Sequence, residues 1–176
     1  PTANRYGTVK LRPKLDRVHP PALQQRQDMM RMKIAVYMEG QAGLARLMRK
    51  MPGSLAAQYG DAESTYLFGN IATALAKTNA LIKAQPKNAY FQELRGDILM
   101  KANKPKEAAD ASAKAVSLDP ARSGLLPVSL GQALMAVGTP ESLKKAVVQI
   151  NNGLQRDKEN AAGYRYLAQA YGELSD

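Results

Sequence analysis

The sequence predicts an all-α protein, a solenoid of stacked antiparallel helix hairpins, and two regularities predict it. Proline recurs at a spacing of 34 residues, at Pro52, Pro86 and Pro120, and each of these prolines follows a helix-like apolar stretch. Proline ends a helix because it has no amide proton and disfavours helical geometry in the residue before it. Small residues recur with nearly the same spacing. A fixed period of this length indicates one helix hairpin per repeat, so we expect about nine helices.

The small residues stand where the two helices of a hairpin must approach each other closely. Those expected on first helices are Ala62, Gly96, Gly131 and Ala168, and those expected on second helices are Ala74, Ala108 and Ala146. Only small side chains allow such a contact. The steps along the first helices are 34, 35 and 37 residues, so the third cycle carries insertions, near Pro120 and in the turn GTPES.

We expect the elements in the following order. Residues 1–20 form an extended basic leader, because prolines and basic residues are frequent there. Residues 21–176 form the helical repeat domain, with a Met-rich terminal hairpin first. Its hairpins pair 22–38 with 41–50, 55–68 with 71–84, 88–102 with 106–118, and 123–137 with 141–156, and so span 22–50, 55–84, 88–118 and 123–156. A final helix at 161–174 lacks a partner.

The final helix carries a stripe of aromatic and small residues. Tyr164, Leu167, Ala168 and Tyr171 follow the spacing i, i+3, i+4, i+7, which places them on one helix face. We expect Leu167, Ala168 and Tyr171 to pack in the core, because stacked hairpins bury that face against their neighbours. Nothing that follows covers this helix, so we expect the natural chain to continue, or the module to dimerise there.

Composition narrows the classes of protein that the chain can represent. Its 176 residues are enough to bury a sizeable core without disulfides or metals. Cysteine is absent, which removes thiol nucleophiles and thiolate metal sites. No apolar run approaches the roughly 18 residues that a membrane span needs. The chain begins at Pro1 without a signal segment, so we expect it to be a piece of a longer precursor.

The positive charge lies mainly at the N-terminus. The formal net charge is +10, and residues 1–52 hold 11 Lys and Arg against 3 Asp and Glu, whereas residues 53–176 hold 14 against 12. A basic arm can contact nucleic acid, anionic lipid or an acidic partner, but a solvated leader is the simpler interpretation. Nucleic-acid binding is disfavoured, because the positive charge is concentrated outside the repeats and the expected first helices of the repeats carry Glu63, Glu93 and Asp97.

Side chains for catalysis are scarce. His19, the single histidine, stands in the proline-flanked stretch RVHPP, so no helical HExxH zinc pair exists. Glu93 with Asp97, and Asp61 with Glu63, could suggest acid/base pairs, but no nucleophile or metal motif accompanies them, and we expect solvated carboxylates. We therefore expect no catalytic, cofactor-binding or metal-binding residue in this chain.

The repeats resemble the tetratricopeptide family, in NAYFQELRGDILMKANKPKEAADASAKAVSLDP and again in NAAGYRYLAQAYGEL. The resemblance implies a superhelix whose first helices line a groove for a peptide or partner helix. The residues at the family's groove positions are Tyr59, Glu63, Tyr66, Tyr90, Glu93, Asp97, Met100, Leu125, Gln132, Met135, Arg165 and Gln169. The Lys and Asn pattern with which chaperone-binding members hold a terminal carboxylate is absent. Tyr and Met side chains favour adaptable contacts with apolar segments.

The stretch PPALQQRQDMMRMKIAVYMEG, followed by these repeats, is similar to the C-terminal half of bacterial envelope zinc metalloproteases, the family of the beta-barrel assembly-enhancing protease. The similarity implies a periplasmic tail that recruits outer-membrane protein substrates or assembly machinery and packs partly against its own protease domain. The zinc would belong to that peptidase domain, whose HExxH motif is missing here. A free-standing tetratricopeptide scaffold or assembly factor of the envelope is the alternative, and a nucleic-acid-binding protein is a weaker one.

Overall fold

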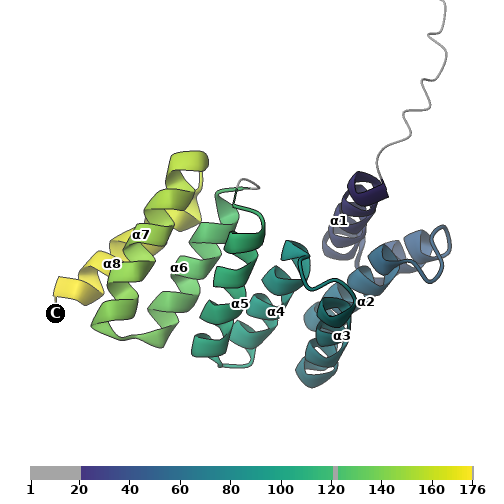
Figure 1. Cartoon of the computed structure of the whole chain (residues 1–176), viewed down its shortest axis with the longest axis horizontal. Helices are drawn as coiled ribbons and strands as arrows, with labels where there is room; N and C mark the ends of the chain where they lie inside the picture. Colours follow the sequence, from purple (N-terminus) through teal and green to yellow (C-terminus); the bar gives the residue numbers. More distant parts are fainter. Residues whose placement is uncertain (1–20, 121–122, 176) are drawn as a thin grey trace, which may run out of the picture.

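The computed structural model describes residues 21–120 and 123–175, and these residues form eight helical segments and no strand. The predicted all-α fold is confirmed. The segments are α1 (Pro21–Met48), α2 (Leu55–Phe68), α3 (Ile71–Ala84), α4 (Ala89–Lys101), α5 (Pro105–Leu118), α6 (Leu125–Val137), α7 (Pro140–Arg156) and α8 (Ala161–Ser175). Figure 1 shows them stacked along the long axis of the molecule, from α1 at one end to α8 at the other.

The first segment, α1, is two helices joined at Gly40. The backbone of Gly40 has φ 64° and ψ −148°, a conformation that breaks the helix and that favours glycine. A Cβ atom built on Gly60 would lie 2.8 Å from Leu44 Cδ1 and 3.0 Å from Met32 Cβ. Residues twelve apart in an unbroken helix would be separated by about 18 Å. The two halves of α1, residues 21–39 and 41–48, therefore fold back on each other.

Local signals in the sequence begin and end the other helices. Ser54, Asn70, Asn88 and Thr139 precede α2, α3, α4 and α7, and each side chain accepts a hydrogen bond from a backbone amide of the first turn. The helices α3 and α5 each end two residues before a proline, at Ala84 and Leu118. The recurrent prolines therefore stand in the turns that connect one hairpin to the next.

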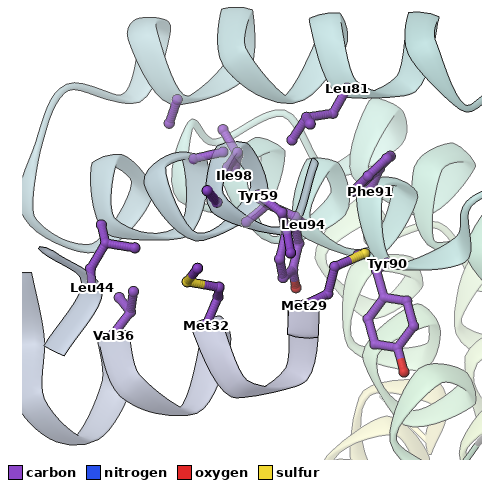
Figure 2. Close-up of a cluster of buried hydrophobic side chains, with 14 residues drawn as sticks. Met29, Met32, Val36, Leu44, Tyr59, Leu81, Tyr90, Phe91, Leu94 and Ile98 are labelled. Carbon is purple, nitrogen blue, oxygen red and sulfur yellow. The ribbon is translucent and has the colours of Figure 1, made fainter. Parts of the chain in front are cut away.

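The core runs along the stack in three clusters. The largest joins α1, α2, α3 and α4, and Figure 2 shows Met29 and Met32 of α1 pointing toward Tyr59. The other two clusters join α4, α5 and α6, and α6, α7 and α8. Small residues allow the helices of each hairpin to approach: a Cβ on Gly96 would lie 2.6 Å from Ser112 Oγ, and Ala62 is fully buried. Burial is therefore shared between neighbouring hairpins, as a repeat architecture requires.

The predicted core packing of the final helix is wrong for Ala168 and Tyr171, whereas Leu167 packs against the core cluster of α6, α7 and α8. Ala168 and Tyr171 of α8 are exposed and Leu167 is half-buried, while Ala170 and Gly163 are the buried residues of this helix. The physical reason is that α8 packs on α7 through its Ala170 face, and among the described residues no further helix covers its other face. Of the predicted stripe, Tyr164, Ala168 and Tyr171 therefore lie on the surface of the described part of the chain.

We expect Gly153→Ala, at the contact between α7 and α6, to destabilise the protein by about 1 to 3 kcal/mol. The new methyl group would lie 2.5 Å from the backbone oxygen of Gly124 and 2.6 Å from Val128 Cγ2, so the two helices would have to move apart. Gly172→Ala in α8 is the matched control, because nothing lies within 4 Å of its Cβ position. There, the better helix propensity of alanine should add about 0.5 to 1 kcal/mol. Urea unfolding followed by circular dichroism measures both, and equal stability of the two variants would contradict the expected contact.

Candidate functional site

The first helices of the hairpins form one layer of the stack. Along this layer α2 contacts α4, α4 contacts α6 and α6 contacts α8. The first half of α1 packs on α2, and its Lys33 reaches both Glu63 of α2 and Glu93 of α4. The predicted groove residues all come from α2, α4, α6 and α8.

A hollow of about 320 Å³ lies between α4, α6 and α8. It is lined by Met100, Gln132, Met135, Ala136, Tyr166, Gln169 and Glu173. Four of the predicted groove residues thus meet here, namely Met100, Gln132, Met135 and Gln169. The Gln169 amide donates a hydrogen bond of 2.7 Å to Glu173 Oε1. Thioether, aromatic and amide groups together offer apolar contact and hydrogen bonding to a polypeptide segment.

Sequence reasoning missed Tyr166 in this hollow. Tyr166 lies two residues after Tyr164, the aromatic residue of the predicted stripe, and on a different face of α8. The Arg165 guanidinium lies over the Tyr166 ring, 5.2 Å from the ring centroid. Tyr166 precedes the predicted groove residue Gln169 by three residues, a spacing that places both on one side of a helix. This spacing is the signal that could have identified Tyr166.

A charged cluster joins α1, α2 and α4. Lys33 Nζ lies 3.3 Å from Glu63 Oε1 and 3.4 Å from Glu93 Oε1, and the Tyr59 hydroxyl donates a hydrogen bond of 2.6 Å to Glu63 Oε1. Asp97 stands one helical turn after Glu93 and acts electrostatically on the same lysine. Lys33 therefore faces three carboxyl groups from two other helices.

Burial shifts the pKa values of this cluster. Burial, and then the negative charge of Glu93, raises the pKa of Asp97 to about 7. Burial also raises the pKa of Glu63, although Lys33 opposes that shift. For Lys33, burial alone lowers the pKa, but the carboxylates of Glu93, Glu63 and Asp97 together outweigh burial and raise it. Lys33 is therefore held as a cation, and the carboxyl groups around it are in excess.

Four predicted groove residues are buried, and the prediction of an open groove is wrong for two of them, Tyr59 and Glu63. Tyr59 and Glu63 are fully buried, because the first half of α1 packs over α2 through Met29, Met32 and Lys33. Tyr90 and Met135 are each 7% exposed, but Met135 borders the hollow between α4, α6 and α8, and Tyr90 borders a second one. The expectation of solvated carboxylates also fails for Glu63, whereas its neighbour Asp61 forms a half-exposed ion pair of 2.6 Å with Lys77.

Tyr90 lines a second, larger hollow, of about 750 Å³, at the start of α1. Gln25 donates a hydrogen bond of 2.8 Å to Gln85 across it, and Arg26 forms an ion pair of 2.9 Å with Asp119. The Arg26 guanidinium also stands 5.9 Å from the centroid of the Tyr90 ring. The period of the repeats does not predict this hollow, because it arises from the first half of α1, which is longer than the other first helices.

The remaining predicted residues are scattered along the layer. Tyr66, Glu93 and Asp97 are half-buried, and Lys101 Nζ lies 5.0 Å from the centroid of the Tyr66 ring. Leu125, at the start of α6, and Arg165 are exposed and line neither hollow. The structure therefore gathers four of the predicted residues at the hollow between α4, α6 and α8, and does not gather the others there.

Residues 21–120 and 123–175 contain no group of three or more His, Cys, Asp and Glu side chains arranged to hold a metal ion. Within the same ranges, no helix combines the length and the apolar character that crossing a bilayer requires. His19 and the basic leader lie outside the described residues.

Comparisons with known proteins identify the fold. A MamA protein from Desulfovibrio magneticus RS-1 superposes with a TM-score of 0.65 at 18% identity, covering 88% of this chain and 86% of that one. The first TPR of Spaghetti (RPAP3), bound to the HSP90 peptide SRMEEVD, gives 0.64 at 16% identity, covering 69% and 94%. A thermophilic TPR protein from Thermus thermophilus gives 0.60 at 15% identity, covering 87% and 82%. Neither a protein-family model nor a curated protein matches the chain.

These likenesses define the class of the protein by its fold. The chain has the tetratricopeptide fold, a solenoid of helix hairpins, in agreement with the 34-residue spacing of its prolines. At these identities the comparisons concern the fold alone.

Proposed function

We propose that this chain is a non-catalytic protein-interaction module that holds a polypeptide against its layer of first helices. The observation that carries the proposal is the hollow between α4, α6 and α8, where Met100 and Tyr166 stand beside the exposed amides of Gln132 and Gln169. Aromatic and thioether groups supply adaptable apolar contact, and amides can bond the backbone of an extended segment. The peptide-bound Spaghetti structure supports this use of the fold.

The bound segment is not expected to be anchored by a terminal carboxylate. The Lys and Asn pattern for such an anchor is absent from the sequence, and the α2–α4 part of the layer holds more carboxyl groups than cations around Lys33. Like charges disfavour an anionic end there. We therefore place an uncharged or apolar segment in the hollow.

A photocrosslinking amino acid at position 132 tests the proposed groove, and the same amino acid at Lys144 is the control. Both positions are exposed, but Lys144 lies on α7, a second helix, away from the hollow. We expect polypeptide adducts at position 132 that are about tenfold more abundant than at position 144, and that decrease when Met100→Glu places a charge in the hollow. Equal labelling at both positions, or adducts with nucleic acid alone, would count against a peptide groove.

We further propose that the module belongs to an envelope zinc metalloprotease and acts in the periplasm as its substrate- or partner-recruiting tail. The support is the likeness of PPALQQRQDMMRMKIAVYMEG and the repeats to that family. In this proposal the zinc and the catalytic residues belong to a peptidase domain, and this chain contributes none of them. A reading frame that encodes HExxH upstream is the expected finding. A signal segment followed directly by repeats would instead favour a free-standing scaffold or assembly factor.

Dimerisation through α8 is a further proposal, supported by the exposed face of Tyr164, Ala168 and Tyr171. Light scattering of the purified chain decides it. A mass twice that of the chain, reduced to one chain by Tyr171→Glu, is the expected result for a dimer.

A further inference from the structure

The first half of α1 carries a stripe of large apolar side chains that face solvent. Leu23, Met30, Ile34, Tyr37 and Met38 are 39% to 79% exposed. At 3.6 residues per turn, these positions fall within an arc of about 100° and extend over about 22 Å of the helix. The arc lies apart from the face that holds Met29, Met32 and Val36 in the core. The helix α1 is thus apolar on two separate faces, of which the fold uses one.

The fold gives no reason for this second apolar face. Among the described residues, no other segment covers this face of α1, and its five large apolar side chains remain exposed. The stripe is also a ridge, since of its five residues only Leu23 borders either hollow described above. A ridge of apolar groups requires a partner surface that can receive it.

Cationic side chains flank the stripe on both sides. On the same helical projection Arg26 lies beside one edge of the arc and Arg31 beside the other. Both are largely exposed, and they form ion pairs with Asp119 and Asp28 respectively. The second half of the hairpin and the turn after it add Arg46, Arg49 and Lys50. The region up to residue 52 holds 11 Lys and Arg against 3 Asp and Glu, whereas the rest of the chain is nearly balanced. The apolar stripe therefore lies in the most basic part of the chain.

We propose that the first half of α1 binds the surface of an anionic lipid bilayer, with the helix lying in the plane of the interface. The apolar stripe enters the boundary between head groups and acyl chains, and the net positive charge of the hairpin, which includes the exposed Arg49 and Lys50, attracts lipid phosphates. Tyr37 suits this position, because amphipathic aromatic rings favour the interface. A bilayer receives a convex ridge without a preformed groove, and its negative charge complements the basic hairpin.

This surface is separate from the proposed peptide groove. The stripe lies on the first helix of the stack, whereas the hollow lies between α4, α6 and α8 toward the other end (Figure 1). The module can therefore hold a polypeptide while α1 rests on lipid. Loss of one activity leaves the other measurable.

Flotation of the full chain with lipid vesicles tests the proposal. The vesicles are phosphatidylcholine alone, or phosphatidylcholine with about one third phosphatidylglycerol, at about 50 mM and about 300 mM NaCl. We expect binding to the anionic vesicles to be about tenfold stronger than to the neutral ones, and to weaken at the higher salt concentration.

Two double variants isolate the stripe from the basic leader. Ile34→Ser/Met38→Ser removes two apolar groups of the stripe and is expected to reduce binding to anionic vesicles about fivefold or more. The control, Leu125→Ser/Val148→Ser, removes two similarly exposed apolar groups from α6 and α7 and is expected to bind like the unaltered chain. Circular dichroism of each variant checks that the helices are retained.

Three results would overturn the proposal. One is the absence of binding to anionic vesicles by the unaltered chain. Another is full binding by the stripe variant, which would assign lipid contact to the leader alone. The third is a doubled mass in light scattering that the stripe variant abolishes, which would identify the stripe as a contact between protein chains. Crosslinking at position 132 is independent of all three.

Discussion

Lys33→Met is expected to destabilise the protein by about 3 to 5 kcal/mol at pH 8. The substitution removes the cation that lies 3.3 Å from Glu63 and 3.4 Å from Glu93. The Glu63 side chain is only 1% exposed, so water cannot solvate the carboxylate that is left behind. The loss should become smaller as the pH falls, because protonation of Glu63 removes the uncompensated charge. Urea unfolding at pH 8 and pH 5 measures both effects.

Lys77→Met provides the matched control for this cluster. Lys77 forms an ion pair of 2.6 Å with Asp61, but both side chains are half-exposed, and water screens their charges. We expect a loss of at most about 1 kcal/mol. The double variant Lys33→Met/Glu63→Gln should recover part of the stability lost in Lys33→Met, because it removes the stranded charge. A loss for Lys33→Met no greater than for Lys77→Met would show that the cluster is not effectively buried.

Asp97→Asn is expected to stabilise the protein at pH 8, by about 2 to 4 kcal/mol. Burial, together with Glu93, raises the pKa of Asp97 from 3.8 in the unfolded chain to about 7 in the folded one. Between pH 3.8 and pH 7 the folded state therefore binds more protons at Asp97 than the unfolded state does. The protonated Asp97 side chain thus favours folding at low pH, and this contribution to stability is lost as the pH rises through 7. Asparagine, which stays neutral, avoids the loss.

Unfolding of both proteins between pH 5 and pH 8 checks this prediction. The difference in unfolding free energy between Asp97→Asn and the unaltered chain should be less than half as large at pH 5 as at pH 8, because at pH 5 the unfolded carboxyl has already lost most of its protons whereas the folded one keeps them. Asp110→Asn is the control, because Asp110 is exposed on α5 and its substitution should change stability by less than about 0.5 kcal/mol at either pH. A stability difference that does not depend on pH would mean that Asp97 ionises as an ordinary carboxylate.

The fold could be predicted from the sequence because a repeat architecture depends on local signals that recur. Prolines every 34 residues end the hairpins, and small residues such as Gly96 mark the contacts within them. The four residues around the hollow could also be predicted, since corresponding positions of successive first helices face the same side of the stack. Gln132 and Gln169 are examples.

Accessibility, in contrast, was decided by the tertiary structure. A period indicates which face a residue occupies but not what packs over it, and the first half of α1 turns Tyr59 and Glu63 from expected groove residues into core. Likewise, Tyr171 occupies a core position of the repeat yet is exposed, because no described helix covers it. The sequence by itself determined the repeat and the side of each helix on which a residue lies, because helix ends and helix periodicity depend on residues close together in the chain. The tertiary structure alone decided which of those faces are open and that Lys33 meets carboxylates 30 and 60 residues away, because burial and charge pairing depend on neighbours distant in the chain.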